Sequence, residues 1–242
     1  MIRIENLTKS FNHHKILDGI SLQIKDAEFF CLMGASGQGK TVFLKHLIGL
    51  LKPDSGSVNI EGKDIAGFNE SQLLLIRRNF GYLFQEDTLF DFMDVYDNLA
   101  LPIREHTKKS EDEISALINT ALEEVELKGI EHKSTQELSG GMKKRVNLAR
   151  AIILKPKILF CDEPTAGLDP ATGLAIARLI LKLCRQLHTT TVVVSHDVNN
   201  FFNIADRIAI IEQGRIVALG RKEDIEKSQE PSVKRFLLKD IR

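Results

Sequence analysis

Residues 34–41 read GASGQGKT, which fits the pattern GxxxxGK[ST]. The apolar run EFFCLM at 28–33 comes directly before this segment, and VFLKHLIGLL at 42–51 follows it with helical spacing up to Lys52 and Pro53. The order strand, glycine loop, helix predicts a phosphate-binding loop, because backbone N–H groups and the helix dipole at such a turn favour an anion. The segment therefore predicts an α/β fold around a parallel sheet.

Short apolar or alternating runs predict further strands at 2–7, 20–24, 57–62, 79–84, 157–164, 189–196, 207–212 and 215–220. Helices are predicted at 170–187 and near 197–205. Between these parts the strand signals stop, and amphipathic patterns predict helices at 95–103, 111–127 and 140–154. We therefore expect an ATPase-like core of residues 1–85 and 156–242, with a helical subdomain of residues 86–155 inserted into it.

Composition restricts the class of partner. The chain has 242 residues with 33 basic and 33 acidic side chains, so its formal net charge of zero argues against nucleic-acid binding by whole-surface electrostatics. Cys31 and Cys161 lie in apolar runs without metal-ligand spacing, which predicts buried, reduced thiols and a reducing cytosol. We expect no secretory signal and no membrane span, so that any membrane role runs through a partner.

Several polar and charged residues near the ends of the predicted strands are of the types that phosphoryl transfer requires. Lys40 supplies a positive charge to phosphate oxygens and Thr41 a hydroxyl to Mg²⁺. Asp162 ends the strand in KILFCDEP and is predicted to hold Mg²⁺, while Glu163 is suited to polarise the water that attacks the γ-phosphate. The alternative for this pair is a solvated acidic strand end, which the upstream glycine loop disfavours.

Three more side chains are candidates through their position. His196 and Gln85 each follow a predicted strand, and parallel strands end on the nucleotide side of such folds. We predict that His196 reaches the γ-phosphate and that the Gln85 amide contacts Mg²⁺ or water; the alternatives are a structural histidine and an ordinary loop amide. Phe11, in what we expect to be a polar loop, SFNHH, is predicted to stack on adenine, with a core role as the alternative.

A second glycine-rich helix start occurs at 138–142, LSGGM. Ser139 is a good N-cap, and Gly140 and Gly141 leave bare amides that favour an anion. The chain has one phosphate-binding loop and is therefore expected to bind one nucleotide. The second anion-binding helix start would have a function if it contacts a nucleotide bound to another copy of the chain. The helix that follows carries a row of basic residues, interpreted as a solvated face: Lys143, Lys144 and Arg145.

These segments together resemble the ATP-binding-cassette (ABC) transporter ATPases along nearly the whole chain. The matching elements are GASGQGKT, Gln85, LSGGM, LFCDEP, AGLD at 166–169 and His196. The resemblance implies an α/β P-loop NTPase of the ABC nucleotide-binding type, with an antiparallel β subdomain and an inserted helical subdomain. It also implies ATP and Mg²⁺ as cofactors and ATP hydrolysis as the activity.

The resemblance also implies which residues form the site. Glu163, His196 and Gln85 would be catalytic, and Thr41, Gln85 and Asp162 would hold the metal. In a head-to-tail homodimer, Ser139, Gly140 and Gly141 of one subunit would close on the ATP bound to the other, with Asp169 coupling the two sites. The residues expected to contact ATP within one subunit are Phe11, Gly34, Ala35, Ser36, Gly37, Gln38, Gly39, Lys40, Thr41 and Val42.

A narrower resemblance is carried by residues 39–56, 84–106, 138–152 and 231–237, which look like the ATPases of MCE-linked lipid transporters of the Mla (maintenance of lipid asymmetry) and Mkl type. Val42 stands where many transporter ATPases carry a second hydroxyl, as is common in this group. The resemblance implies phospholipid transport at the cytoplasmic side of the inner membrane, with the ATPase bound peripherally. Expected partners are integral-membrane permease subunits, an MCE-domain subunit and a small regulatory subunit.

Apolar residues are dense next to Gln85 and have two interpretations. They form either the core of the helical subdomain or a groove that receives a short helix of a membrane subunit; they are Leu89, Phe90, Phe92, Met93, Val95, Tyr96 and Leu99. The rival functions are an ATPase for another small solute, a soluble cassette protein of DNA repair or translation, and a P-loop kinase. The single neutral cassette disfavours the second, and LSGGM with His196 disfavours the third.

Overall fold

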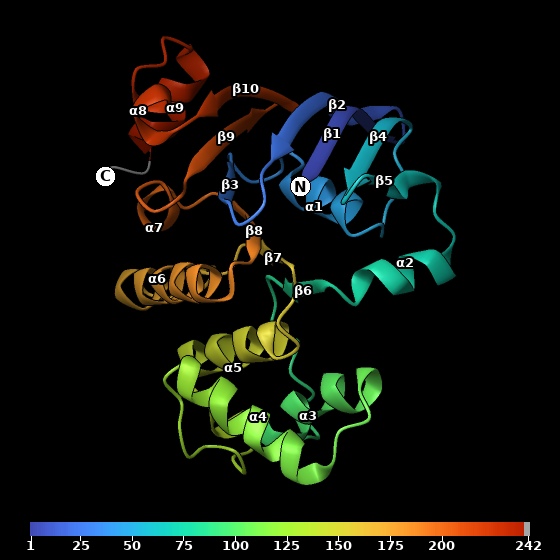
Figure 1. The fold of residues 1–242 in the computed structure, drawn as a ribbon. Coiled ribbons are helices and arrows are strands. Elements are labelled where there is room, and N and C mark those ends of the chain that lie inside the picture. Colours follow the sequence, from blue (N-terminus) through green and yellow to red (C-terminus); the bar gives the residue numbers. More distant parts are fainter. Residues whose placement is uncertain (240–242) are drawn as a thin grey trace.

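The computed structural model describes residues 1–239, and a six-stranded sheet runs through its centre (Figure 1). Its order is β10-β9-β3-β8-β7-β6, in which β10 is antiparallel to β9 and the other neighbours are parallel. The strands are β3 (Phe29–Met33), β6 (Phe80–Leu83), β7 (Ile158–Asp162), β8 (Thr190–Ser195), β9 (Arg207–Glu212) and β10 (Arg215–Gly220). The predicted mostly parallel sheet is confirmed.

An antiparallel sheet of order β2-β1-β4-β5 forms a second layer. Helix α1 (Lys40–Leu47) packs between the two sheets, and its Phe43 shares one buried core with Ile4 and Phe30. The strands of this sheet are β1 (Ile2–Phe11), β2 (His14–Ile24), β4 (Ser55–Ile60) and β5 (Lys63–Asp64). The start of α1 is therefore held by packing from both sides.

Helix α1 is shorter than predicted, since it ends at Leu47 and not at residue 51. Gly49 has a φ of 69°, in the left-handed region that ends helices, and its N–H donates to the carbonyl of His46. The N–H of Leu50 donates to the carbonyl of Lys45. The apolar residues after Gly49 keep the helical spacing in the sequence, although the helix itself has already ended.

Three helices pack against one another in the inserted region: α3 (Val95–His106), α4 (Glu111–Glu124) and α5 (Gly140–Ile152) (Figure 1). They share a core with α6 (Pro170–Leu187), whose bounds match the prediction. Among these, Ile103, Ile118 and Leu148 are fully buried. The helical character of the region is as expected, while the subdomain bounds 86–155 stay a prediction.

The remaining elements lie at the periphery. The helices are α2 (Glu70–Arg77), α7 (Val198–Phe201), α8 (Lys222–Glu226) and α9 (Pro231–Lys239), and the two 3₁₀ turns are η1 (Ile65–Gly67) and η2 (Thr135–Glu137). Only α7 corresponds to a predicted helix. Among residues 1–239, no helix is both long enough and apolar enough to cross a bilayer.

The cysteines lie in the core around the central sheet. Cys31 on β3 and Cys161 on β7 both pair with Val193 on β8, so they flank the same residue. Cys184 on α6 packs beside Thr191 on β8. All three thiols are free and buried, which confirms the prediction made for Cys31 and Cys161.

Candidate functional site

A cavity of about 400 Å³ opens where β3, β6, β7 and β8 end. Because these strands are parallel, their carboxyl ends meet at one edge of the sheet, as expected for a ligand site in an α/β fold. The lining residues are Phe11, Ile16, Ser36, Gly37, Gly39, Lys40, Thr41, Val42, Gln85, Glu163 and His196. All of these except Ile16 were predicted from the sequence. Ile16 lies in the first half of β2, which had no clear strand signal.

The glycine loop is shaped for close backbone approach. Gly37 and Gly39 have φ values of 81° and 94°, which favour glycine. A side chain at Gly39 would also place its Cβ 2.9 Å from the carbonyl oxygen of Ile16. Gly39 is the N-cap of α1 and gives no side-chain cap, so the first N–H groups of α1 face the cavity as anion donors.

Lys40 is the buried cation of the cavity, with an exposed fraction of 6%. Its Nζ donates to the carbonyl oxygens of Gly34 at 2.8 Å and Ala35 at 3.1 Å. The same Nζ lies 3.2 Å from Oε1 of Glu163. Lys40 therefore joins the glycine loop to the end of β7.

Glu163 lies between Lys40 and His196. Its backbone has a φ of 44°, in the left-handed region, so the carboxylate leaves the line of β7 and turns into the cavity. Oε2 accepts a hydrogen bond from the His196 backbone N–H at 3.1 Å and lies 2.9 Å from His196 Nδ1. The His196 side chain is 50% exposed, so it forms the open rim of this cluster.

Asp162 contacts different partners from Glu163. Its Oδ1 accepts from the Thr41 hydroxyl at 3.0 Å, and its Oδ2 accepts from the Tyr82 hydroxyl at 3.4 Å. Burial raises the pKa of the Asp162 carboxyl, and the hydrogen bond from Thr41 partly offsets the rise. A buried carboxylate beside a hydroxyl is a donor set that suits Mg²⁺, which binds through few protein oxygens.

Within residues 1–239, no group of three or more His, Cys, Asp or Glu side chains could hold a metal by itself. Mg²⁺ commonly takes part of its ligands from nucleotide phosphates, which would complete a site at Thr41 and Asp162.

Gln85 lines the cavity from the loop after β6, and a buried lysine of α5 fixes its backbone. Lys144 Nζ donates to the carbonyl oxygens of Phe84, at 3.2 Å, and of Gln85. This corrects the interpretation of a solvated basic face, because Lys144 is only 7% exposed. Burial lowers the pKa of Lys144. Arg145 is also engaged, donating to the Val125 carbonyl at 2.9 Å.

Several predicted residues lie outside this cavity. Ala35 and Gln38 line a smaller cavity beside α9, where Gln38 Oε1 accepts from the Gln213 backbone N–H. Gly34 is packed against β9, since a Cβ there would lie 2.5 Å from the Ile211 carbonyl oxygen. Phe11 does line the cavity, but it is the last residue of β1, paired with His14, and not a loop residue as predicted.

The residues predicted to act on another copy's nucleotide lie together, away from the cavity. Ser139 caps α5 by accepting from the Met142 N–H at 3.3 Å, and Asp169 caps α6 by accepting from the Thr172 N–H at 3.0 Å. A Cβ at Gly141 would lie 2.9 Å from Thr172 Cγ2, so the two helix starts adjoin. None of these residues, nor Gly140, lines the cavity in the part of the chain that is described.

Comparison with known proteins decides the family. The family model described as "ABC transporter" matches residues 17–166 of the chain. The chain belongs to the ABC transporter family. The resemblance inferred from GASGQGKT, LSGGM and LFCDEP is therefore confirmed.

Relatives within the ABC transporter family match almost the full chain. The probable ribonucleotide transport ATP-binding protein mkl of Mycobacterium leprae is 44% identical over 98% of this chain and 68% of its own length. The intermembrane phospholipid transport system ATP-binding protein MlaF of Haemophilus influenzae is 40% identical over 98% of this chain and 90% of its own length. The chain spans about two thirds of the mycobacterial relatives, 68% and 66%.

Solved ABC cassettes share the fold. The dimeric, post-hydrolysis structure of the ATP-binding cassette MJ0796 with ADP and Pi has a TM-score of 0.84 and 31% identity, covering 92% of this chain and 99% of that one. The cassette cbiO1 of Clostridium perfringens has a TM-score of 0.85 and 28% identity, covering 99% and 98%. The two sheets and the inserted helices are therefore those of an ABC nucleotide-binding domain, as predicted.

Proposed function

We propose that this chain is the ATP-hydrolysing subunit of an ABC transporter that drives phospholipid transport through a separate membrane permease. The observation that supports ATP hydrolysis as the activity is a cluster of three side chains in one cavity, Lys40, Glu163 and His196. The pair Thr41 and Asp162 lies beside this cluster. The MlaF relatives support phospholipid as the cargo. A methionine import protein, MetN of Clostridium tetani, is 37% identical over 98% of this chain, so import of a small solute is the second candidate.

ATP would be held at its two ends by different layers of the fold. The N–H groups at the start of α1 and the Lys40 ammonium bind phosphate oxygens. The Phe11 ring, 42% exposed at the cavity mouth, stacks on adenine from the antiparallel sheet. Thr41, Asp162 and Gln85 would hold Mg²⁺, which neutralises charge that develops on the phosphates.

Glu163 is the proposed general base. Its carboxylate accepts a proton from the attacking water, and a positioned base of this kind contributes about 10²–10⁴ in rate. The hydrogen bond from the His196 N–H fixes one oxygen, while the other faces Lys40 at 3.2 Å. Phosphate oxygens compete with Glu163 for the Lys40 ammonium, so ATP binding would leave the carboxylate available to water.

A second copy of the chain is proposed to complete the site. Ser139, Gly140 and Gly141 form a helix start that can donate N–H groups to an anion, yet they lie outside the cavity of their own chain. A head-to-tail homodimer would place them over the partner's ATP, with Asp169 next to them at the start of α6. The dimeric MJ0796 cassette supports this arrangement.

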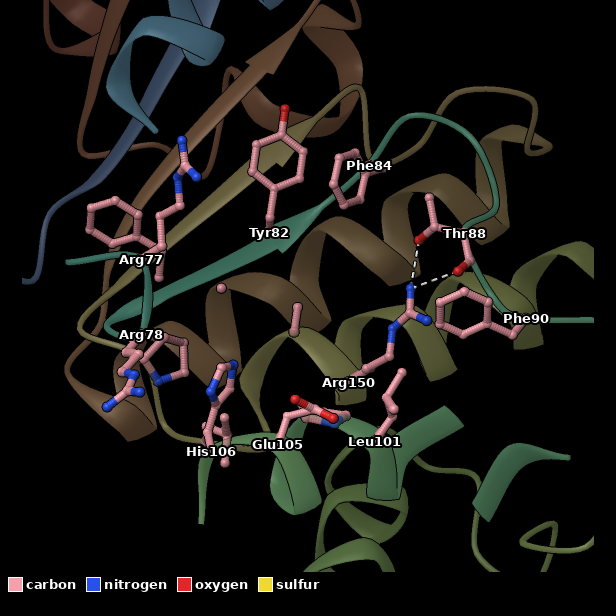
Figure 2. A pocket seen from close by; sticks show the side chains of 16 residues that line it. Arg77, Arg78, Tyr82, Phe84, Thr88, Phe90, Leu101, Glu105, His106 and Arg150 are labelled. Atoms are coloured by element: carbon pink, nitrogen blue, oxygen red, sulfur yellow. Dashed lines mark hydrogen bonds between the residues drawn. The ribbon is translucent and has the colours of Figure 1, made fainter. Parts of the chain in front are cut away.

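The permease contact is proposed to be a groove of about 610 Å³ between β6, α3 and α5 (Figure 2). Phe84, Phe90 and Leu101 give it an apolar wall. Arg150 lies across it and donates to the carbonyl and hydroxyl oxygens of Thr88, at 3.0 and 2.6 Å (dashed in Figure 2). An apolar wall beside a polar rim of this kind suits the apolar anchors of a short helix.

The apolar residues after Gln85 divide between the core, which the structure shows, and the proposed groove. Leu89, Val95 and Leu99 are buried in the core, whereas Phe90 lines the groove. Phe92 is 81% exposed, and its ring centroid lies 5.7 Å from that of Phe90. Phe92 therefore extends the apolar surface beyond the groove, where a membrane partner would cover it.

Purification of the tagged chain from native membranes tests the proposal. We expect integral permease subunits to co-purify, together with an MCE-domain subunit and a small regulatory subunit, on the cytoplasmic side of the inner membrane. Leu101→Asp should release the permease, because it places a charge in the groove. Leu74→Asp is the matched control, since Leu74 is 58% exposed and does not line the groove. Recovery of a solute-binding protein without an MCE subunit would favour the import function.

A further inference from the structure

Tyr82 lies on β6, which lines the groove and leads into the loop of Gln85 at the site. It pairs in parallel register with Phe160 of β7, and Asp162 is two residues further along β7. Residues two apart on a strand share a face, so Asp162 and Phe160 are on the same side of the sheet. The Tyr82 ring lines the groove, while its hydroxyl donates to Asp162 Oδ2 at 3.4 Å.

We propose that Tyr82 is a positioning residue that ties the groove wall to the metal-binding carboxylate of Asp162. The inference rests on the proposed function, because it takes Asp162 as a magnesium ligand and the groove as the permease contact. Each oxygen of Asp162 has one donor: Thr41, from the glycine loop, holds Oδ1, and Tyr82 holds Oδ2. With both donors present, the carboxylate plane has a fixed orientation toward Thr41.

Packing alone does not account for a tyrosine at this position. The Tyr82 ring packs against Phe84 with centroids 4.2 Å apart, a contact that phenylalanine would make equally well. The added hydroxyl is useful only if it has a partner, since a partly buried hydroxyl without one loses solvation. Figure 2 shows the Tyr82 ring beside Phe84, with its hydroxyl pointing away from Leu101 and Arg150.

Tyr82 therefore contributes to both the groove wall and the metal-binding site. A helix seated in the groove would contact the rings of Tyr82 and Phe84, and a change in the χ1 angle of Tyr82 would move its hydroxyl relative to Asp162. Outer-shell hydrogen bonds orient metal ligands, and losing one typically weakens metal binding about 10–100-fold. At 3.4 Å the Tyr82 bond is long, so we expect an effect near the lower end of that range.

The test is the Mg²⁺ dependence of ATP hydrolysis by Tyr82→Phe. We expect the Mg²⁺ concentration for half-maximal rate to rise about tenfold, while binding of a fluorescent ATP analogue in EDTA stays unchanged. Tyr96→Phe is the matched control: it removes a hydroxyl with a bond of the same length, 3.4 Å to Glu111 Oε2, far from the cavity. A melting curve verifies that both variants fold.

A second variant tests the link to the groove. Phe84→Leu loosens the contact with the Tyr82 ring, so it should raise the half-maximal Mg²⁺ concentration in the wild-type background and have no effect in the Tyr82→Phe background. If wild type itself hydrolyses no ATP with Mg²⁺, the proposed function and this inference are both wrong. If the wild type is active and Tyr82→Phe and Tyr96→Phe reach half-maximal rate at the same Mg²⁺ concentration, the positioning role of Tyr82 is wrong. The proposed function would then still stand.

Discussion

The Lys40 ammonium lies 3.2 Å from Oε1 of Glu163, and the two side chains are only 6% and 9% exposed. A buried ion pair depends on both partners, because removing one leaves the other without compensation for its lost hydration. The same lysine is the cation proposed to bind phosphate beside the glycine loop. Phosphate binding would therefore release the Glu163 carboxylate from this ammonium group.

Glu163→Gln should lower ATP hydrolysis by about 10²–10⁴, because an amide cannot accept the proton of the attacking water. ATP binding should persist, since Lys40 is relieved of its competing carboxylate. Phosphate release and nucleotide binding, measured on the same preparation, verify the two effects separately. Glu61→Gln is the control, as Glu61 pairs with Lys157 outside the cavity. An undiminished rate in Glu163→Gln would contradict the assignment of the base.

Ser139→Arg should abolish hydrolysis while leaving ATP binding at Lys40 nearly intact, because Ser139 is proposed to act on the partner's nucleotide. The substitution also removes a helix cap, which typically costs about 1 kcal/mol. Ser110→Arg removes an equivalent cap, with its serine Oγ also 3.3 Å from the backbone N–H that it accepts, on α4. Comparing the two variants isolates the effect on the dimer. Equal loss of binding and hydrolysis in Ser139→Arg would argue against a role in trans.

Lys144→Met should lower the free energy of unfolding by about 1–3 kcal/mol, because the carbonyls of Phe84 and Gln85 lose a buried donor. Lys143→Met is the neighbouring control. Lys143 forms a more exposed ion pair with Asp87 at 3.2 Å, and its loss should cost less than about 1 kcal/mol. Denaturant unfolding of both variants measures the difference. Similar losses would show that the Lys144 contacts add little to stability.

His46 should make the protein less stable at mildly acidic pH. It is 1% exposed, its Nδ1 lies 2.7 Å from the Val42 carbonyl oxygen, and burial lowers its pKa. Below the unfolded pKa of about 6.5 the unfolded chain binds a proton that the folded chain does not, so stability falls with decreasing pH, by at most about 1.4 kcal/mol per unit. The loss ends once the pH is below the folded pKa.

Denaturant unfolding at pH 7.5 and 5.5 measures this effect. His46→Leu should flatten the pH dependence between these values, since it removes the titrating group. His13→Leu should leave the dependence unchanged, because His13 is exposed. A His46→Leu variant with the full wild-type pH dependence would assign the effect to another group.

The parts of the site that depend on local chemistry could be predicted from the sequence. The glycine loop and the acidic residues at the end of β7 follow from strand and helix signals in their immediate neighbourhood, and the structure places them together. The contacts among Lys40, Glu163 and His196 could not be predicted. They depend on the register of β3, β7 and β8 and on the left-handed backbone of Glu163, which follow from tertiary packing.

Lys144 and Tyr82 were also missed, because their pattern gives no signal. Lys144 has charged neighbours on both sides, and adjacent charges on a helix do not indicate which one faces the core. Tyr82 occupies an ordinary alternating position in a strand, so its contact with Asp162 appears only once β6 and β7 are paired. The antiparallel sheet came from the family resemblance, since only parts of β1, β2 and β4 had strand signals of their own.

The three buried cysteine thiols around the central sheet can report how often the fold opens. Burial raises the pKa of Cys184 to about 12 and also raises the pKa values of Cys31 and Cys161, so in the folded protein the three thiols are protonated and shielded. A thiol reagent can modify them only while the sheet is open. Since a ligand of the folded form reduces the open population in proportion to its binding, alkylation rates would report nucleotide occupancy without any added label.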